Sequence, residues 1–438
     1  MTPKEFYIEN FKIFQHKLNG ESKSFLNEFR KESFNKFSSL EFPTNKNEDW
    51  KYTDTAPVLK HNFLPLEKAD TAGISGDEIK KHLFKNIESH LLVFIDGFLS
   101  PQLSSLYTLP KGVFIGSLND LSKSNPAVIE QHLNKISDQE TAFSALNGSY
   151  AMDGLAVIIP EGTILERPVQ VLFLNGGSSE NLLSVPRNLI IAGKNSNLKL
   201  IMSYKGYAGK NYLSNIVTEI FAGENSVLDI CKVQDENENS YHIEKLQAIQ
   251  KSGSVLNHYN ISFGGSIVRN DINSVLDGEK IETHYYGLYL ATGNQHMDNH
   301  TFVDHAKPDC MSNELYKGIL DGNSRGVFNG KIIVRKDAQK TNAYQQNKTI
   351  LLSKNATIDT KPQLEIFADD VKCSHGATVG HLDETSEFYI RSRGVPQELA
   401  KSMLIRAFAS DVIENLKIEE LKEQINHLIF EHLHKIEI

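Results

Sequence analysis

A degenerate repeat in the middle of the chain constrains the fold more than any other feature of the sequence. Residues 191–200 and 221–230 share the pattern Ala-Gly-x-Asn-Ser-x-Leu-x-Leu/Ile at an offset of 30 residues. Weaker echoes follow at 253–259 and 279–285, which lie 26 residues apart. A degenerate period of this length, made of strands and turns, is typical of the stacked coils of a β-solenoid.

The sequence around this repeat keeps one pattern of residue types from residue 154 to residue 394. Short β-branched runs alternate with Gly, Asn and Asp, and helical periodicity is weak. We therefore predict a mainly β protein with a parallel β-helix core over 154–394. A sandwich or barrel stays open as an alternative, because the Asp-Gly and Asn-Gly pairs at 153–154, 277–278, 321–322 and 329–330 suit hairpin turns.

The N-terminal region, residues 1–153, follows a helical pattern and then mixed short elements. Aromatic and aliphatic residues recur at helical spacing over the first 50 residues, which predicts about two amphipathic helices. We interpret their phenylalanine stripe as an internal packing face. Trp50, the one tryptophan in the chain, is interpreted as the anchor of a loop on a core.

The C-terminal region, residues 395–438, also follows a helical pattern. Pro396 suits the first turn of a helix, and Leu399, Met403 and Phe408 follow at helical spacing before a second apolar stripe begins at Ile418. Two helices of this length are too small to form a core alone. We expect them to dock on the end of the solenoid or to present a face to a partner.

Composition narrows the class of protein. The 438 residues are 40% apolar and 23% charged, which is ordinary for a well-cored protein, and the net charge of −9 argues against a nucleic-acid partner. No stretch has the apolar length of a membrane span or of a signal peptide core, so we predict a cytoplasmic protein without a membrane partner.

Several families of catalytic motif are missing from the sequence. The segment 206–211 contains Gly-Lys but lacks the spacing of a phosphate-binding loop, and neither a Gly-x-Ser-x-Gly elbow nor a His-Glu-x-x-His helix occurs. Three scattered cysteines exclude both a disulfide framework and a self-contained four-cysteine cluster. We interpret Cys231 and Cys310 as buried apolar residues.

Histidines and carboxylates gather at two further places. On a strand, His296 and His300 would share one face while His305 points to the other, which fits either a metal site or a polar ladder on the solenoid surface. The adjacent pair Asp369 and Asp370 would point to opposite faces of a regular strand. That geometry disfavours a carboxylate pair, although a β-solenoid carbohydrate-active lyase or hydrolase remains the alternative function.

Cys373 and His375 form the strongest candidate site. They stand two residues apart in a predicted strand, so their side chains point to one face about 7 Å apart. A metal ion or iron–sulfur cluster usually needs three or four ligands. The pair alone is therefore an incomplete site.

The sequence segments around this pair resemble those of a known family. Five segments closely resemble the SufB/SufD family of the SUF iron–sulfur cluster assembly machinery: 318–332, 338–347, 358–366, 368–380 and 392–394. The similarity is dense over about residues 295–410, and residues 48–53 match a characteristic segment near the family's amino terminus. The chain's length and its few scattered cysteines favour the SufD branch.

The resemblance implies a fold and a role. It implies a right-handed parallel β-helix flanked by helical ends, acting as a non-enzymatic scaffold that pairs with a SufB-like subunit. The region 395–438 would receive a SufC-like ATPase, and a transient iron–sulfur cluster would be shared at the interface, with His375 as a ligand and Cys373 as an auxiliary one. A purely structural role for His375 stays open, as does a homodimer of the isolated chain through its unpaired solenoid surface.

Overall fold

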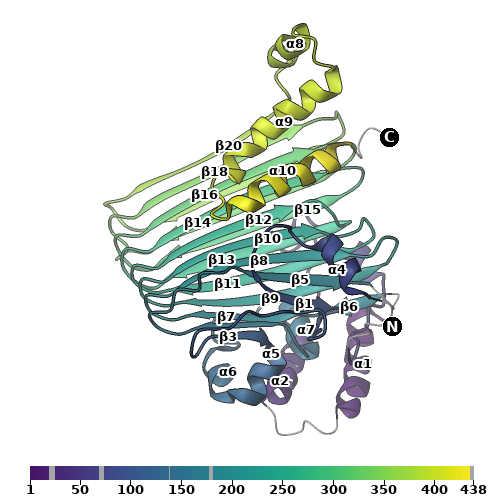
Figure 1. The fold of residues 1–438 in the computed structure, drawn as a ribbon, viewed down its shortest axis with the longest axis vertical. Coiled ribbons are helices and arrows are strands. Elements are labelled where there is room, and N and C mark those ends of the chain that lie inside the picture. The colour runs from purple at the N-terminus through teal and green to yellow at the C-terminus, as the bar shows by residue number, and fades with distance from the viewer. Residues whose placement is uncertain (19–24, 69–73, 138, 177–180, 435–438) are drawn as a thin grey trace.

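The computed structural model describes the chain except residues 19–24, 69–73, 138, 177–180 and 435–438 (Figure 1). Its strands build two long sheets. The first has the order β2-β1-β5-β8-β10-β12-β14-β16-β18-β20, and the second has the order β19-β17-β15-β13-β11-β9-β7-β4-β3, with β6 paired to β9. From β8 onward, each coil gives one strand to each sheet, and neighbouring strands are parallel. The predicted parallel β-solenoid is confirmed, and the sandwich and barrel are excluded.

The strands of the first half are β1 (His90–Ile95), β2 (Phe98–Leu99), β3 (Phe114–Ser117), β4 (Leu155–Ile159), β5 (Val169–Asn175), β6 (Leu182–Ser184), β7 (Arg187–Ala192), β8 (Asn197–Gly206), β9 (Tyr212–Ala222) and β10 (Val227–Asp235). Those of the second half are β11 (Tyr241–Gln250), β12 (Val255–Ser262), β13 (Ile267–Leu276), β14 (Glu282–Ala291), β15 (His296–His305), β16 (Met311–Leu320), β17 (Arg325–Val334), β18 (Asn342–Leu351), β19 (Thr357–Ile366) and β20 (Lys372–Gly380).

The helices of the N-terminal region are α1 (Pro3–Lys17), α2 (Phe25–Ser39), the 3₁₀ turn η1 (Glu48–Trp50), α3 (Ala56–Leu59), α4 (Gly76–His82), α5 (Leu118–Ser124), α6 (Pro126–His132) and α7 (Ala142–Tyr150). Those of the C-terminal region are α8 (Glu384–Ser392), α9 (Gln397–Ile413) and α10 (Glu419–His434). None of the described helices is both long and apolar enough to cross a membrane.

The sequence repeat is the turn of the solenoid. Asn195 and Asn225 both adopt a left-handed backbone, with φ of 54° and 55°, a conformation that Asn tolerates better than most residues. The side-chain amide of Asn225 donates to Asn195 Oδ1 at 3.2 Å, one 30-residue coil away. Leu198 and Leu228, which follow these turns, pair in register and are fully buried in the lumen.

The N-terminal region closes one end of the solenoid (Figure 1). The two predicted helices are present as α1 and α2, and the phenylalanine stripe is confirmed as an internal face, because Phe11, Phe14, Phe29 and Phe37 are buried. The solenoid itself begins within residues 1–153, since β1 pairs in parallel with β5. Strand β3 then pairs antiparallel with β4 and ends the second sheet.

Trp50 anchors its loop as predicted. Its ring stacks on Phe143 with centroids 5.4 Å apart, and the guanidinium of Arg269 lies 4.0 Å from the ring centroid on the outer face of β13. The Thr53 hydroxyl donates to Asp298 on β15 at 2.5 Å, and Glu48 forms an ion pair with Lys361 on β19. Residues 48–53 therefore strap the N-terminal region to the later coils of the second sheet.

The strands stop before the end of the range 154–394. Strand β20 ends at Gly380, and α8 begins at Glu384 because Asp383 caps it, accepting hydrogen bonds from the backbone amides of Thr385 and Ser386. Helices α9 and α10 then lie against the outer face of the first sheet, where α10 runs along the strands (Figure 1). The expectation that the two helices dock on the solenoid end is wrong, because their apolar side chains pack instead on the outer face of the first sheet.

Candidate functional site

The second end of the solenoid is uncovered. β20 and β19 are the terminal strands of the two sheets, and within the described residues each pairs with a single neighbour, β18 and β17 respectively. Most side chains of β20 are exposed, in contrast to the strands of the middle coils. A free strand edge offers unpaired N–H and C=O groups to another chain.

Cys373 and His375 lie on this last coil. They pair in register with Ala343 and Gln345, both of which are fully buried in β18. The two side chains therefore share the lumen-facing side of β20, in agreement with the strand alternation predicted from sequence. Cys373 is half-buried against the core, whereas His375 is exposed because no further coil covers it.

The three cysteines differ in burial. Burial raises the pKa of Cys231 to about 12 and also raises the pKa of Cys310, and both thiols are almost inaccessible. The prediction that these two are buried apolar residues is confirmed. Partial burial raises the pKa of Cys373 as well, so at neutral pH its free thiol is protonated.

Two residues that face the lumen, Glu314 and Gln345, were not predicted from the sequence as part of the site. Glu314 on β16 pairs in register with Gln345 on β18, directly below the position of His375. The carboxylate oxygen Oε2 of Glu314 accepts hydrogen bonds from Gln345 Nε2 at 3.2 Å and from the Thr301 hydroxyl. Burial raises the pKa of Glu314 to about 7. The only sequence signal was spacing, since Glu314 and Gln345 stand 31 residues apart, one coil of the repeat.

The histidine cluster forms a polar network on the outer face of the second sheet. His300 Nε2 lies 3.0 Å from Asp298, which also receives Arg269 at 2.7 Å, and His296 Nε2 lies 2.8 Å from the Thr53 hydroxyl. His305 points into the lumen, where it pairs with a serine. Across the part of the chain that the structure describes, no group of three or more His, Cys, Asp and Glu side chains is arranged to hold a metal ion.

A groove of about 500 Å³ lies beside the uncovered end. It is bounded by the turn after β18, the residues after β20, and the facing sides of α8 and α9. Helices α8 and α9 also carry exposed apolar side chains: Phe388 and Tyr389 on α8 are 73% and 59% exposed, and Leu399 and Met403 on α9 are 45% and 48% exposed. Helix α8, which is described in full, buries none of its side chains.

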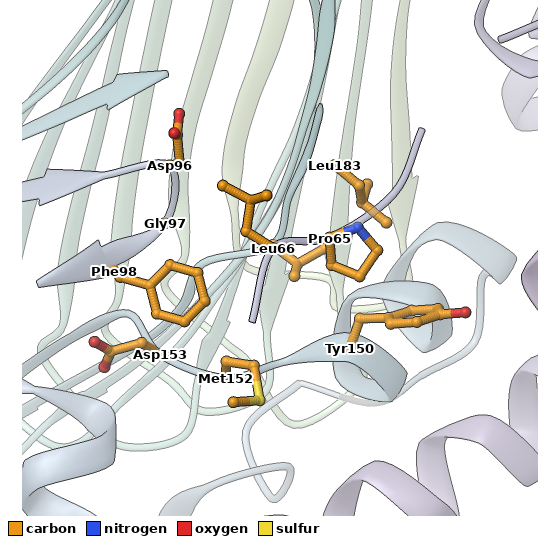
Figure 2. Close-up of a pocket in the computed structure, with 10 residues that line it drawn as sticks. Pro65, Leu66, Asp96, Gly97, Phe98, Tyr150, Met152, Asp153 and Leu183 are labelled. Carbon is orange, nitrogen blue, oxygen red and sulfur yellow. The ribbon is translucent and has the colours of Figure 1, made fainter. Parts of the chain in front are cut away.

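The capped end holds a much smaller pocket, between the β1–β2 hairpin, α7 and β6 (Figure 2). Figure 2 shows Leu66, Phe98 and Met152 gathered around it. Asp153 is its most unusual group, because burial raises the pKa of its carboxyl to about 6. That carboxyl accepts hydrogen bonds from the backbone amides of Leu99 and Asn119, so it ties the cap to the first coils.

Comparison with known proteins assigns the chain to a family. Residues 173–408 match the family model described as SUF system FeS cluster assembly, SufBD core domain, and residues 1–171 match the SufBD protein N-terminal region. An iron–sulfur cluster assembly SufBD family protein of Synechocystis sp. is 31% identical over 95% of this chain and 93% of that protein. The iron–sulfur cluster assembly protein SufD of Escherichia coli is 31% identical over 87% of each chain, and SufD of Bacillus subtilis is 24% identical over 87% of each. The chain belongs to the SufBD family of iron–sulfur cluster assembly proteins.

Proposed function

We propose that this protein is a non-enzymatic, SufD-type scaffold that docks by its uncovered solenoid end to a SufB-like subunit. The observation that carries the proposal is the position of Cys373 and His375 on the last, uncovered coil. There they face a partner that continues the solenoid. The two chains together would form the site at which a nascent iron–sulfur cluster is assembled and from which it leaves.

The uncovered end has the chemistry of an interface. Ile366 on β19 and Val379 on β20 occupy lumen-facing register positions, yet they are 41% and 45% exposed. Covering such side chains with a second solenoid end removes apolar surface from water. The free edges of β19 and β20 can at the same time continue into a partner's strands. An isolated chain is expected to cover the same surface with a second copy of itself.

The ligands on this coil are suited to iron but too few. An imidazole and a thiolate both bind iron in proteins, and a cluster needs more ligands than His375 and Cys373 supply. The remaining ligands would come from the SufB-like subunit across the interface. We assign His375 as the principal ligand from this chain and Cys373 as an auxiliary one, because His375 is the more exposed of the two.

The C-terminal region, 395–438, is proposed to bind a SufC-like ATPase; its last four residues, 435–438, lie outside the described part of the chain. The exposed apolar side chains Leu399 and Met403 on α9 support this role. Residues 206–211, which contain the Gly-Lys pair, join β8 directly to β9 rather than leading into a helix as a phosphate-binding loop does. We therefore assign ATP hydrolysis to the partner.

Family membership favours the scaffold over the carbohydrate-active alternative. The carboxylates considered for that alternative add no support. Asp369 and Asp370 lie in the turn between β19 and β20, where the backbone of Asp370 is tied to Gln339 and Lys340 of the preceding coil. Their position is that of a turn linking two coils.

Anaerobic reconstitution of the complex, co-expressed with SufB-like and SufC-like subunits, tests the proposal. His375→Ala should lower iron and sulfide per complex by at least about tenfold, because a ligand is lost. His16→Ala, on the exposed face of α1, is the matched control and should change neither. Normal cluster content in His375→Ala would leave His375 with a structural role only.

A further inference from the structure

A column of polar side chains runs through the lumen beneath His375. Glu314, Gln345 and His375 occupy the same register position on β16, β18 and β20. Neighbouring strands lie about 4.8 Å apart, so side chains at paired positions on one face are in reach of each other. Glu314 and Gln345 are 1% and 0% exposed, so the column is sealed from solvent below His375.

Hydrogen bonds fix the lower half of this column. Glu314 Oε2 accepts from Gln345 Nε2 and from the Thr301 hydroxyl, and among the described residues no basic side chain pairs with this carboxyl. Because its nitrogen is held by Glu314, the Gln345 amide has a defined orientation. Its carbonyl oxygen, Oε1, is buried without a hydrogen-bond partner among the described residues.

The opposite wall of the lumen is shaped around this amide. A Cβ atom on Gly330, in β17, would stand 2.2 Å from Gln345 Nε2 and 2.6 Å from its Cδ. A larger residue there would displace the amide. A buried acceptor left without a partner costs free energy, commonly about 1–3 kcal/mol, so a retained one needs an explanation.

We propose that Gln345, held in place by Glu314, is a positioning residue for His375. In the assembled site, Gln345 Oε1 accepts the N–H of one ring nitrogen of His375, and the other ring nitrogen is left to bind iron. Metal-binding histidines commonly donate their second N–H to such an acceptor, which fixes the tautomer and the ring orientation. This inference rests on the proposed function, because it assumes that His375 is a ligand.

The test uses the reconstituted complex with Gln345→Leu, which keeps the volume of the side chain and removes the acceptor. Asn347→Leu is the matched control, because Asn347 is a buried amide on the same face of β18 with an unpartnered oxygen, but it pairs with Ala377. Cluster content should fall by about 10- to 100-fold in Gln345→Leu, the usual effect of losing such a partner. Asn347→Leu should leave cluster content unchanged.

Pulsed electron paramagnetic resonance of the reduced cluster reports on the hydrogen bonding of the His375 ring. A purely structural role of Gln345 would leave this signal unchanged. The quadrupole coupling of the remote ring nitrogen of His375 should shift in Gln345→Leu and stay constant in Asn347→Leu. Gln345→Asn, which withdraws the amide by one methylene, should give the same shift if the leucine variant does not fold. An unchanged coupling in both Gln345 variants overturns the inference.

Two further results separate this inference from the proposed function. In the metal-free chain, the Gln345 side-chain amide should lose its distinct resonance and exchange faster in Glu314→Leu; an unchanged resonance also overturns the inference. If His375→Ala keeps the full cluster content and the nitrogen signal, His375 has a structural role only, and the ligand role assigned to it under the proposed function fails. If His375→Ala abolishes both while Gln345→Leu changes neither, only the positioning role fails.

Discussion

The two ends of the solenoid are built in opposite ways. At the first end, every residue of β7 and of α7 is buried, and α1, α2, α5 and α6 cover the early coils (Figure 1). At the second end, β20 is largely exposed and β19 has no buried residue, although the chain continues into three helices. Those helices lie along the first sheet or project beyond it. One end of the solenoid is therefore completed within the chain, whereas the other keeps a free strand edge within the described residues.

The rate of thiol modification should differ more than any other property between the buried coils and the uncovered end. Cys373 should react with a thiol reagent at least about a thousandfold faster than Cys231 and Cys310, which require opening of the core. Because partial burial raises the pKa of Cys373, its rate should keep increasing above pH 8.5. Mass spectrometry of the modified sites checks this order, and equal rates would remove the contrast.

Truncation of one apolar residue at each end should cost very different amounts of stability. Leu189→Ala in β7, which is fully buried under the cap, should lower the free energy of unfolding by about 2–5 kcal/mol. Val379→Ala in β20 should cost less than about 1 kcal/mol in the isolated chain, because Val379 is 45% exposed. Urea denaturation measures both, and a large cost at Val379 would mean that the second end is already covered.

The buried carboxyl near the open end should make stability depend on pH. Burial raises the pKa of Glu314 from 4.5 to about 7, so ionisation opposes folding. The free energy of unfolding should therefore fall as pH rises from about 4.5 to about 7, by up to about 3 kcal/mol relative to Glu314→Gln, and the difference should level off above pH 7. A difference that does not vary with pH would contradict this environment for Glu314.

Two glycines near the open end should respond unequally to alanine. Gly330→Ala places a methyl group 2.2 Å from Gln345 Nε2 and should cost about 1–3 kcal/mol in unfolding free energy. Gly376→Ala on β20 meets nothing within 4 Å and should be close to neutral. Thermal unfolding of the two variants side by side checks this, and equal losses would contradict the packed lumen beneath an uncovered last coil.

The overall fold followed from the sequence because the repeat encodes turns. Asn195 and Asn225 mark equivalent corners of successive coils, and a short polar residue in a left-handed turn leaves a visible pattern. The helices at both ends were predictable for a similar reason, since an amphipathic stripe is local information. Each of these features is contained within a few residues of the chain.

The arrangement of the site depends on how strands from different coils pair, so less of it could be predicted from the sequence. Alternation placed Cys373 and His375 on one face, but only the register with Ala343 and Gln345 shows that this face is the lumen. Coil lengths vary, with paired residues 28 apart in one coil and 31 in another, so the partner Glu314 could not be aligned by counting. The end of β20 at Gly380 depends on the cap at Asp383, which competes with a preceding β-rich run.

Hydrogen exchange of the chain alone and in its co-purified complex tests whether a partner docks on the uncovered end of the solenoid. The chain should be measured dilute, as a monomer, so that a second copy does not cover the same surface. We expect backbone amides of residues 357–380 to exchange at least about tenfold more slowly in the complex, and those of 187–192, already buried, to stay unchanged. Unchanged exchange at 357–380 in a stable complex would show that the partner docks elsewhere and would contradict docking at the uncovered end.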